Sequence, residues 1–507
     1  MRTAPSWTEA VADVGPLLRF RGSGLRGRSR ILAVVGLLVV LGLTVFFAVF
    51  PALGPELSRV SRNDVLILMP SGYLGILAIS LVSSAASGGG RELLPRDQAV
   101  AYPVSPTTDH LGALLMAPLN IAWLVQAWAL LAATAYAIGP RWGLLLAQVP
   151  QVAWLLTATA VAQLVGWCVE WVRRGPHGVL LVRSVTGAFA AVAAVLIFTH
   201  KMSDVLDNSP TVRITVAVIR GADGDIVPWL KVVTSIVLFG LAAIVLGALV
   251  ADRVMRRPPR EEMKVETAPR QPRPNPASTL AALVRTDRSG IWRSVPLRRG
   301  LAVLALMPGS VAIAGSLRWD TLCVMPGLVC SGGALLFGVN SWCLDGRGAL
   351  WRDSLPVSPR LVFTSRVVVL TEVLLVATAA TMLLAMLRAG APTAAQATAI
   401  VCVSVVVAVQ VVATALHWST HRPFAVDMRS ARATPAPPLV MVGYSSRLAL
   451  STTVVGLVFG LSGRTNWESS VALAVPLLAI SVFRMSRTAT AWADPQVRAR
   501  VVATVAS

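Results

Sequence analysis

The chain has 507 residues, of which 55% are hydrophobic and only 14% are charged, and its mean hydropathy is +0.69. This composition excludes a soluble multidomain protein and predicts helices that lie in a lipid bilayer. The net charge is +21, but only three of the 45 Lys and Arg residues are Lys, and the basic residues are scattered between apolar runs. We therefore expect no nucleic-acid partner, because nucleic-acid binding needs a basic stripe on a soluble module.

Residues 1–30 mix apolar side chains, such as Trp7 and Phe20, with several arginines, and they precede the first long apolar run. A mixed apolar and basic stretch beside a membrane span predicts a helix on the membrane surface. We expect a cytoplasmic amphipathic segment here, and no cleaved signal peptide.

Mainly apolar runs follow along the rest of the chain, each about as long as a spanning helix. They cover residues 31–51, 64–86, 111–137, 143–168, 179–199, 229–251, 299–316, 321–343, 361–388, 394–417, 441–462 and 468–485. The pattern predicts an all-α polytopic membrane protein with about twelve transmembrane helices.

Basic residues indicate the orientation of these spans. If both termini are cytoplasmic, the inner segments hold 35 of the 45 Lys and Arg, as the positive-inside rule expects. The Pro- and Arg-rich residues 252–298 cannot pack a core, and they predict a cytoplasmic linker that ends in a second surface helix. This linker divides the chain into six-helix halves at 31–251 and 299–485, with a cytoplasmic tail at 486–507. We expect a multi-pass protein of the plasma membrane of a bacterial cell.

A short polar phrase occurs after the second span of each half. The first copy reads GRELLPRD at 90–97 and PVSP at 103–106, and the second reads GRGALWRD at 346–353 and PVSP at 356–359. Nine identities in the same order favour an internal duplication. Proline fixes φ, and serine favours a helix start, so each copy predicts a stiff cytoplasmic elbow. The simpler alternative, that PVSP only ends one helix and starts the next, stays open.

The second copy runs from Asp345-Gly346-Arg347-Gly348 to Leu355-Pro356-Val357-Ser358, and it resembles the permease subunits of type-two ABC exporters. The resemblance implies that one chain supplies two six-helix units, and that the N-terminal surface helix and these elbows contact a separate ATPase. It implies ATPase-coupling loops that contain Arg91, Arg96, Asp97, Pro103, Ser105 and Pro106 in the first half, and Asp345, Arg347, Arg352, Asp353, Pro356, Ser358 and Pro359 in the second. The first half has Gly-Gly-Arg-Glu at 89–92 in place of Asp-Gly-Arg-Gly.

Lysine occurs only at positions 201, 231 and 264, so the chain has no Gly-Lys-Ser/Thr phosphate loop. We therefore expect a transport subunit that is not an enzyme and binds no cofactor itself. ATP and magnesium would be bound by the partner, a cytoplasmic ABC ATPase subunit present in two copies. The expected function is export of an amphipathic or lipid-like substrate, as in multidrug or lipid efflux. The alternative is a major-facilitator-type secondary transporter, which also has twelve spans in two halves and is driven by an ion gradient.

Glu372 lies within the ninth apolar run, where an ionised carboxylate costs about 2.5 to 3.5 kcal/mol on insertion scales. Two interpretations are open. Glu372 lines the translocation pathway or couples to protons, or it pairs with Arg366 near the cytoplasmic end of the span. The corresponding place in the first half is close to Asn120, and the amides of Asn120 and Gln126 complete the predicted pathway.

Two further features predict no chemistry of their own. His417 and His421 have the spacing of a zinc-protease helix, but Trp418 stands where that chemistry needs a glutamate, so we expect an interfacial pair and no metal site. The outer segment 199–228 predicts either a cap over the exit of the pathway or a solvated loop.

Overall fold

The computed structural model describes residues 7–23, 28–55, 61–87, 104–119, 121–199, 201, 204–205, 208–257, 274–314, 317–346, 348–425 and 438–506. Within these ranges the regular structure is entirely helical. The chain divides into two compact units, Met1–Ala268 and Pro269–Ser507. The boundary falls inside the segment 252–298 for which the sequence predicts a linker, and residues 258–273 of that segment lie outside the described ranges.

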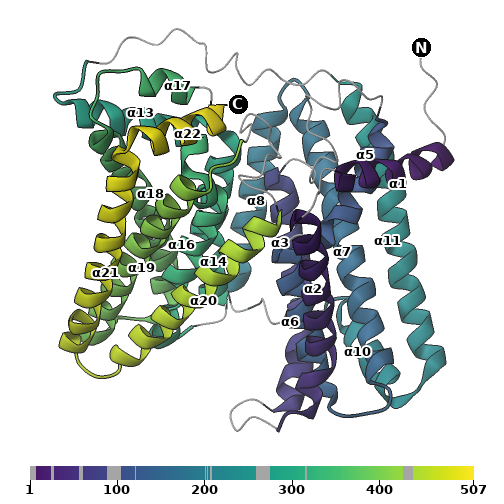
Figure 1. Ribbon diagram of the computed structural model, residues 1–507. Helices are drawn as coiled ribbons and strands as arrows, with labels where there is room; N and C mark the ends of the chain where they lie inside the picture. Colours follow the sequence, from purple (N-terminus) through teal and green to yellow (C-terminus); the bar gives the residue numbers. More distant parts are fainter. Residues whose placement is uncertain are drawn as a thin grey trace. The chain divides into compact units, whose positions relative to one another are not determined.

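The first unit is built around α7, which packs against α3, α6, α8, α10 and α11 (Figure 1). The helices of this unit are α1 (Trp7–Ser23), α2 (Arg28–Leu53), α3 (Arg62–Ser87), α5 (Pro106–Met116), the 3₁₀ helix η1 (Ala117–Leu119), α6 (Ile121–Ile138), α7 (Leu144–Arg173), α8 (Gly178–Phe198), α10 (Val212–Asp223) and α11 (Ile226–Met255).

Buried polar side chains of α7 bind the neighbouring helices. The Gln148 amide donates to the backbone of α2 and α6, the Gln151 amide donates to the Tyr73 hydroxyl of α3, and the Thr157 hydroxyl donates to the α11 backbone. Each bond satisfies a polar group that would otherwise be buried without a partner. These bonds therefore add directional contacts to a core that is otherwise held by apolar packing.

The second unit is built around α19, whose buried face consists mainly of valines and alanines. The helices of this unit are α13 (Thr279–Arg293), α14 (Val295–Ala314), α15 (Trp319–Leu322), α16 (Met325–Phe337), the 3₁₀ helix η2 (Gly338–Leu344), α17 (Gly348–Asp353), α18 (Pro359–Ala389), α19 (Ala394–His421), α20 (Pro438–Ser462), α21 (Trp467–Ala493) and α22 (Pro495–Ala506). In Figure 1, α22 lies across the end of this unit beside α17, and the two helices are in contact.

The order of packing partners is alike in the two units. In the first, α2 packs against α6, α3 against α6 and α7, and α7 against α11. In the second, α14 packs against α18, α16 against α18 and α19, and α19 against α21. Each unit also begins with a mixed apolar and basic helix, α1 or α13.

Among the described residues, nine helices are long and apolar enough to cross a membrane, or ten if the bent pair formed by α13 and α14 counts as one span. The prediction of about twelve spans is therefore not confirmed. The predicted run 111–137 is not one helix, because α5 ends at Met116 and a 3₁₀ turn that contains Pro118 separates it from α6. Shorter apolar helices occupy Trp123–Ile138 and Gly178–Phe189.

The segment 199–228, which the sequence predicts to lie on the outer side of the membrane, contains a helix, α10, which packs against α7, α11 and α3. The Thr211 hydroxyl donates to the Pro70 carbonyl, and the Trp229 indole donates to the Leu146 carbonyl. Gly143 lies directly against the α10 backbone, where a Cβ would come within 2.3 Å of the Ala222 carbonyl oxygen. The helical part of this segment is thus packed onto the bundle, and it is not a plain solvated loop.

Candidate functional site

The elbow of the second unit, residues 345–359, has a defined backbone course. Gly346 adopts a φ of +48°, in the left-handed region that glycine enters most readily, and turns the chain from η2 into the short helix α17. After α17, a tight turn over Pro356 joins the Val357 amide to the Leu355 carbonyl at 2.7 Å. Ser358 then precedes Pro359, the first residue of α18, as the sequence predicts, although the Ser358 side chain makes no capping bond.

Arg352 anchors this elbow to α13, which we call the surface helix after the position that the sequence predicts for it. Its guanidinium donates to both carboxylate oxygens of Asp287, at 2.6 and 3.2 Å, and to the Asp345 carboxylate at 3.1 Å. It also donates to the Ser365 hydroxyl of α18 at 3.0 Å. A planar guanidinium that meets a carboxylate at two points fixes orientation as well as distance. The elbow, the surface helix and α18 therefore meet at a single side chain.

Arg366 of α18 completes the arrangement. Its guanidinium donates to Asp345 at 2.6 Å and lies 3.5 Å from Asp287. The Ser365 hydroxyl donates to Asp287 at 2.8 Å. We call Asp287, Asp345, Arg352 and Arg366 the buried charge cluster.

The buried charge cluster is electrically balanced, with two carboxylates and two guanidinium groups. The side chains of Arg366 and Asp287 are only 1% and 2% exposed. Burial alone raises the pKa of the Asp287 carboxyl, but Arg366 and Arg352 outweigh this effect and hold the pKa below its usual value. The Asp287 carboxylate is thus kept charged, and the removal of any one of the four side chains leaves its partners buried with an unbalanced charge.

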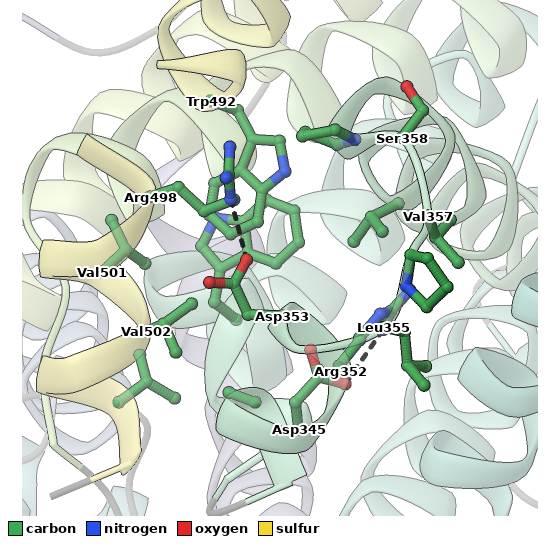
Figure 2. Close-up of a pocket in the computed structure, with 16 residues that line it drawn as sticks. Asp345, Arg352, Asp353, Leu355, Val357, Ser358, Trp492, Arg498, Val501 and Val502 are labelled. Carbon is green, nitrogen blue, oxygen red and sulfur yellow. Dashed lines mark hydrogen bonds and ion pairs between the residues drawn. The ribbon is translucent and has the colours of Figure 1, made fainter. Parts of the chain in front are cut away.

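On its other side the elbow packs against the C-terminal helix α22. The Arg498 guanidinium donates to the Asp353 carboxylate at 2.8 Å, and the indole rings of Trp342 and Trp492 stack 3.8 Å apart. Between α17 and α22 lies a pocket of about 350 Å³. Figure 2 shows Val501 and Val502 on the α22 side of this pocket, beside the ion pair of Asp353 and Arg498.

Glu372 lies seven residues after Ser365 on α18, so the two side chains share one face of the helix. Its carboxylate pairs with Arg288 of α13 at 2.7 Å, and both side chains are partly exposed. The predicted alternative, a pair with Arg366, is wrong, because Arg366 is bound to Asp345 and Asp287. Two consecutive residues of α13 therefore contact α18 at two places along its length. Asp287 contacts Ser365 and Arg366, and Arg288 contacts Glu372.

In the first unit, Ser105 caps α5 as predicted: its hydroxyl oxygen accepts from the Thr108 amide at 3.0 Å, and Pro106 is the first helical residue. The Thr108 hydroxyl donates to the Ala10 carbonyl of α1 at 3.4 Å, which links this elbow to its own surface helix. Gln126 lies half-buried on α6. The remaining predicted site residues lie outside the described ranges: Arg91, Arg96, Asp97, Pro103, Asn120 and Arg347.

His110 of α5, which the sequence analysis did not single out, is fully buried against α7 and α11. Its Nδ1 accepts from the Trp167 indole at 3.1 Å, so Nε2 carries the proton and donates to the Ile244 carbonyl at 3.1 Å. Burial lowers the pKa of His110 to about 4, against the opposite effects of Ile244 and Asp109. The ring is therefore neutral, and it joins the first elbow to two spanning helices.

The sequence analysis also did not identify Asp287 and Arg366 of the buried charge cluster as site residues. For Asp287, the sequence does contain an indication of a buried partner. Asp287 lies four residues after Leu283 and four before Ile291, both buried, so a carboxylate sits on the apolar face of an amphipathic helix. Such a carboxylate needs a cationic partner in the core. The sequence gives no comparable signal for the partnership of Arg366 with Asp345.

Comparison with protein-family models, with curated proteins and with solved structures finds no match for the chain. Its long apolar helices define an all-α, membrane-embedded protein. Any narrower function has to be argued from the residues of the two units.

Proposed function

We propose that the chain is the transmembrane permease subunit of an ATP-driven exporter of the type-two ABC class, in which one chain carries both six-helix halves. It works with a separate cytoplasmic ATPase, in two copies, and moves an amphipathic or lipid-like substrate out of a bacterial cell. The observation that carries the proposal is the attachment of the second elbow: Arg352 holds it to α13 and α18 through the buried charge cluster.

An elbow that transmits force needs one part fixed in the permease and another part free for the partner. In α17 the fixed part is Arg352, whose guanidinium is largely buried. The free part consists of Leu350 and Trp351, and the Trp351 side chain is 76% exposed. Exposed apolar residues on a segment outside the spans favour a protein contact. We infer that Trp351 contacts the ATPase and that Arg352 transmits the movement to α18.

The helices of the two units pack against one another in a similar order along the chain, which supports the internal duplication that this proposal needs. In the first unit the contact of α1 with α5, through Thr108 and Ala10, corresponds to the contact of α13 with the second elbow. Both surface helices would then be connected to an elbow, one in each half.

The ion-driven alternative has less support. Coupling to protons or other ions needs a carboxylate whose charge is free to change within the membrane. Glu372, the residue considered for that role, pairs with Arg288 on the neighbouring helix. We therefore rank the secondary transporter second.

The test is to purify the tagged chain in mild detergent and assay ATP hydrolysis before and after removal of co-purifying proteins. The proposal expects a co-purifying protein that hydrolyses ATP and that is lost from the Trp351→Ala variant. A matched control is Trp467→Ala, because Trp467 is also exposed but begins α21, at the end of the unit opposite to the elbow. ATP hydrolysis by the isolated chain, or substrate transport driven by a proton gradient in ATPase-free liposomes, would contradict the proposal.

A further inference from the structure

Four basic side chains lie where α19 and α21 reach the elbow end of the second unit. His417 and His421 belong to the end of α19, and Arg484 and Arg487 belong to α21. All four residues are exposed, and His417 is within electrostatic range of the other three. We call them the basic patch. The elbow end is identified by Trp342, which stacks on Trp492 of α21 and donates to the Thr420 hydroxyl of α19.

The geometry of the basic patch holds its histidines in place. The rings of His417 and His421 lie 4.2 Å apart, and Nδ1 of His421 donates to the His417 carbonyl at 2.8 Å. This bond uses the Nδ1 hydrogen and fixes the orientation of the His421 ring, so that Nε2 is the ring nitrogen turned away from the helix backbone. His417 approaches the Thr488 hydroxyl of α21 at 3.5 Å, which ties the two helices together at this point.

The arginines of the basic patch lack acidic partners. Arg484 and Arg487 are within electrostatic range of His417. Among the described residues no carboxylate pairs with any member of the basic patch, whereas Arg352, Arg366, Arg464 and Arg498 of the same unit are all paired. Arg484 and Arg487, which lie near the same histidine without a carboxylate partner among the described residues, therefore favour an anion from outside the chain.

An apolar, exposed surface leads directly to the basic patch along α21. Ile480 precedes Arg484 by four residues, and Phe483 precedes Arg487 by four, so each apolar side chain lies on the same helix face as one arginine. Because both Ile480 and Phe483 are exposed on a candidate span, they face lipid chains in a bilayer. A ligand that fits this surface has an anionic head at the basic patch and an apolar tail along α21.

We propose that the basic patch binds the phosphate group of an anionic phospholipid in the leaflet on the elbow side of the membrane. Free phosphate has the same head chemistry, but it makes no use of Ile480 and Phe483. Basic clusters between spanning helices bind anionic headgroups in this way, and arginine is suited to a phosphate because its guanidinium donates at two points. This site is independent of the proposed export function, because it needs only a membrane-embedded chain.

The test uses the purified full chain in lipid nanodiscs and native mass spectrometry to count bound lipids, with phosphatidylglycerol and phosphatidylcholine as probes. We expect bound phosphatidylglycerol on the wild-type protein and a loss of about 30-fold in its affinity for Arg484→Gln/Arg487→Gln, since each basic residue near the surface contributes to binding. Arg484→Lys/Arg487→Lys keeps the charge and should retain most of the binding. Arg360→Gln should change nothing, because Arg360 is an exposed arginine of the same unit but lies outside the basic patch.

Equal binding of phosphatidylglycerol by the wild type and the double Gln variant would overturn the proposal. So would an equal preference for the two lipids. Inorganic phosphate is a separate arm: if it binds the detergent-purified chain with the affinity of the lipid, free phosphate is the ligand and the lipid assignment is wrong. A thermal melting curve for each variant shows whether the fold is kept. If the Gln variant does not fold, loss of phosphatidylglycerol binding by the well-folded Lys variant overturns the role of charge.

Discussion

Arg352 donates hydrogen bonds to both carboxylate oxygens of Asp287, a residue 65 positions earlier in the chain. The bond crosses from the elbow to the surface helix, and Ser365 and Arg366 of α18 meet the same carboxylate. A displacement of the elbow therefore moves the surface helix and a spanning helix with it, or else breaks buried ion pairs. This connection underlies the first prediction.

Asp287→Ala should destabilise the second unit strongly. The change leaves Arg352 and Arg366 buried with only one carboxylate, Asp345, and breaking a buried pair by removing one partner costs about 3 to 5 kcal/mol. We expect a clear fall in the thermal midpoint of the purified chain. The double variant Asp287→Leu/Arg352→Met should recover much of this loss, because it removes one charge of each sign. A double variant no more stable than Asp287→Ala would argue against the charge balance inferred here.

Glu372→Gln should have a small effect on stability. Its partner Arg288 is half exposed, and pairs of this kind contribute about 0 to 1 kcal/mol. If ATP drives transport, the variant should also keep most of its transport activity in a vesicle uptake assay. Arg288→Gln is the matched control and should behave alike. Complete loss of transport by Glu372→Gln, with Arg288→Gln unaffected, would instead favour the ion-driven alternative.

The sequence correctly predicted those features of the fold that depend on residues within a single segment. Apolar runs predicted helices in both units, because hydropathy and length act within each segment. The start of α5 at Ser105 and Pro106 was also predictable, since a capping side chain and a fixed φ act over a few residues. The break at Pro118 shows the limit, because the surrounding residues are as apolar as those of an unbroken span.

Contacts between distant segments were harder to predict. The elbow was expected to be stiff because of its prolines, but much of its attachment comes from Asp287 and Arg366, which lie outside the repeated phrase. Residues 486–507 were predicted only to be a cytoplasmic tail, and the sequence analysis assigned them no packing role. In the structure, Val501, Val502 and Val505 of α22 are buried against the rest of the unit. Their spacing of one and four residues is helical, but it does not say which surface they cover.

The stability of the first unit should fall as the pH is lowered from 6.5 toward 4. His110 is held neutral, with a pKa of about 4, whereas in the unfolded chain it takes up a proton near pH 6.5. The unfolded state binds more protons in this window, so acid favours unfolding, by about 2 kcal/mol at pH 5 relative to pH 8. Thermal midpoints measured across this range for the wild type and for His110→Gln should converge at low pH. Parallel curves would show that His110 does not titrate as inferred.

Val502→Asp should detach α22 from the elbow. Val502 is buried and lines the pocket beside α17, so a carboxylate there would lose its hydration and compete with Asp353 for Arg498, which lies four residues earlier on the same helix. We expect faster hydrogen exchange in Gly348–Asp353, measured by mass spectrometry. Ala503→Asp is the control, because Ala503 lies on the exposed face of the same helix. Unchanged exchange in α17 would mean that the buried charge cluster alone holds the elbow.

Gly460→Ala should weaken the packing of α20 on the start of the span formed by α15 and α16. Gly456 and Gly460, one turn apart on α20, both lie against backbone, and a Cβ on Gly460 would come within 2.6 Å of the Asp320 carbonyl oxygen. Relieving such a clash requires a backbone shift, which typically costs about 1 to 3 kcal/mol. Gly443→Ala in the same helix is the matched control: a Cβ there has no neighbour within 4 Å, and alanine is the better helix former, so its thermal midpoint should stay equal or rise. Equal losses in both variants would mean that helix propensity, and not the close approach at Gly460, decides the effect.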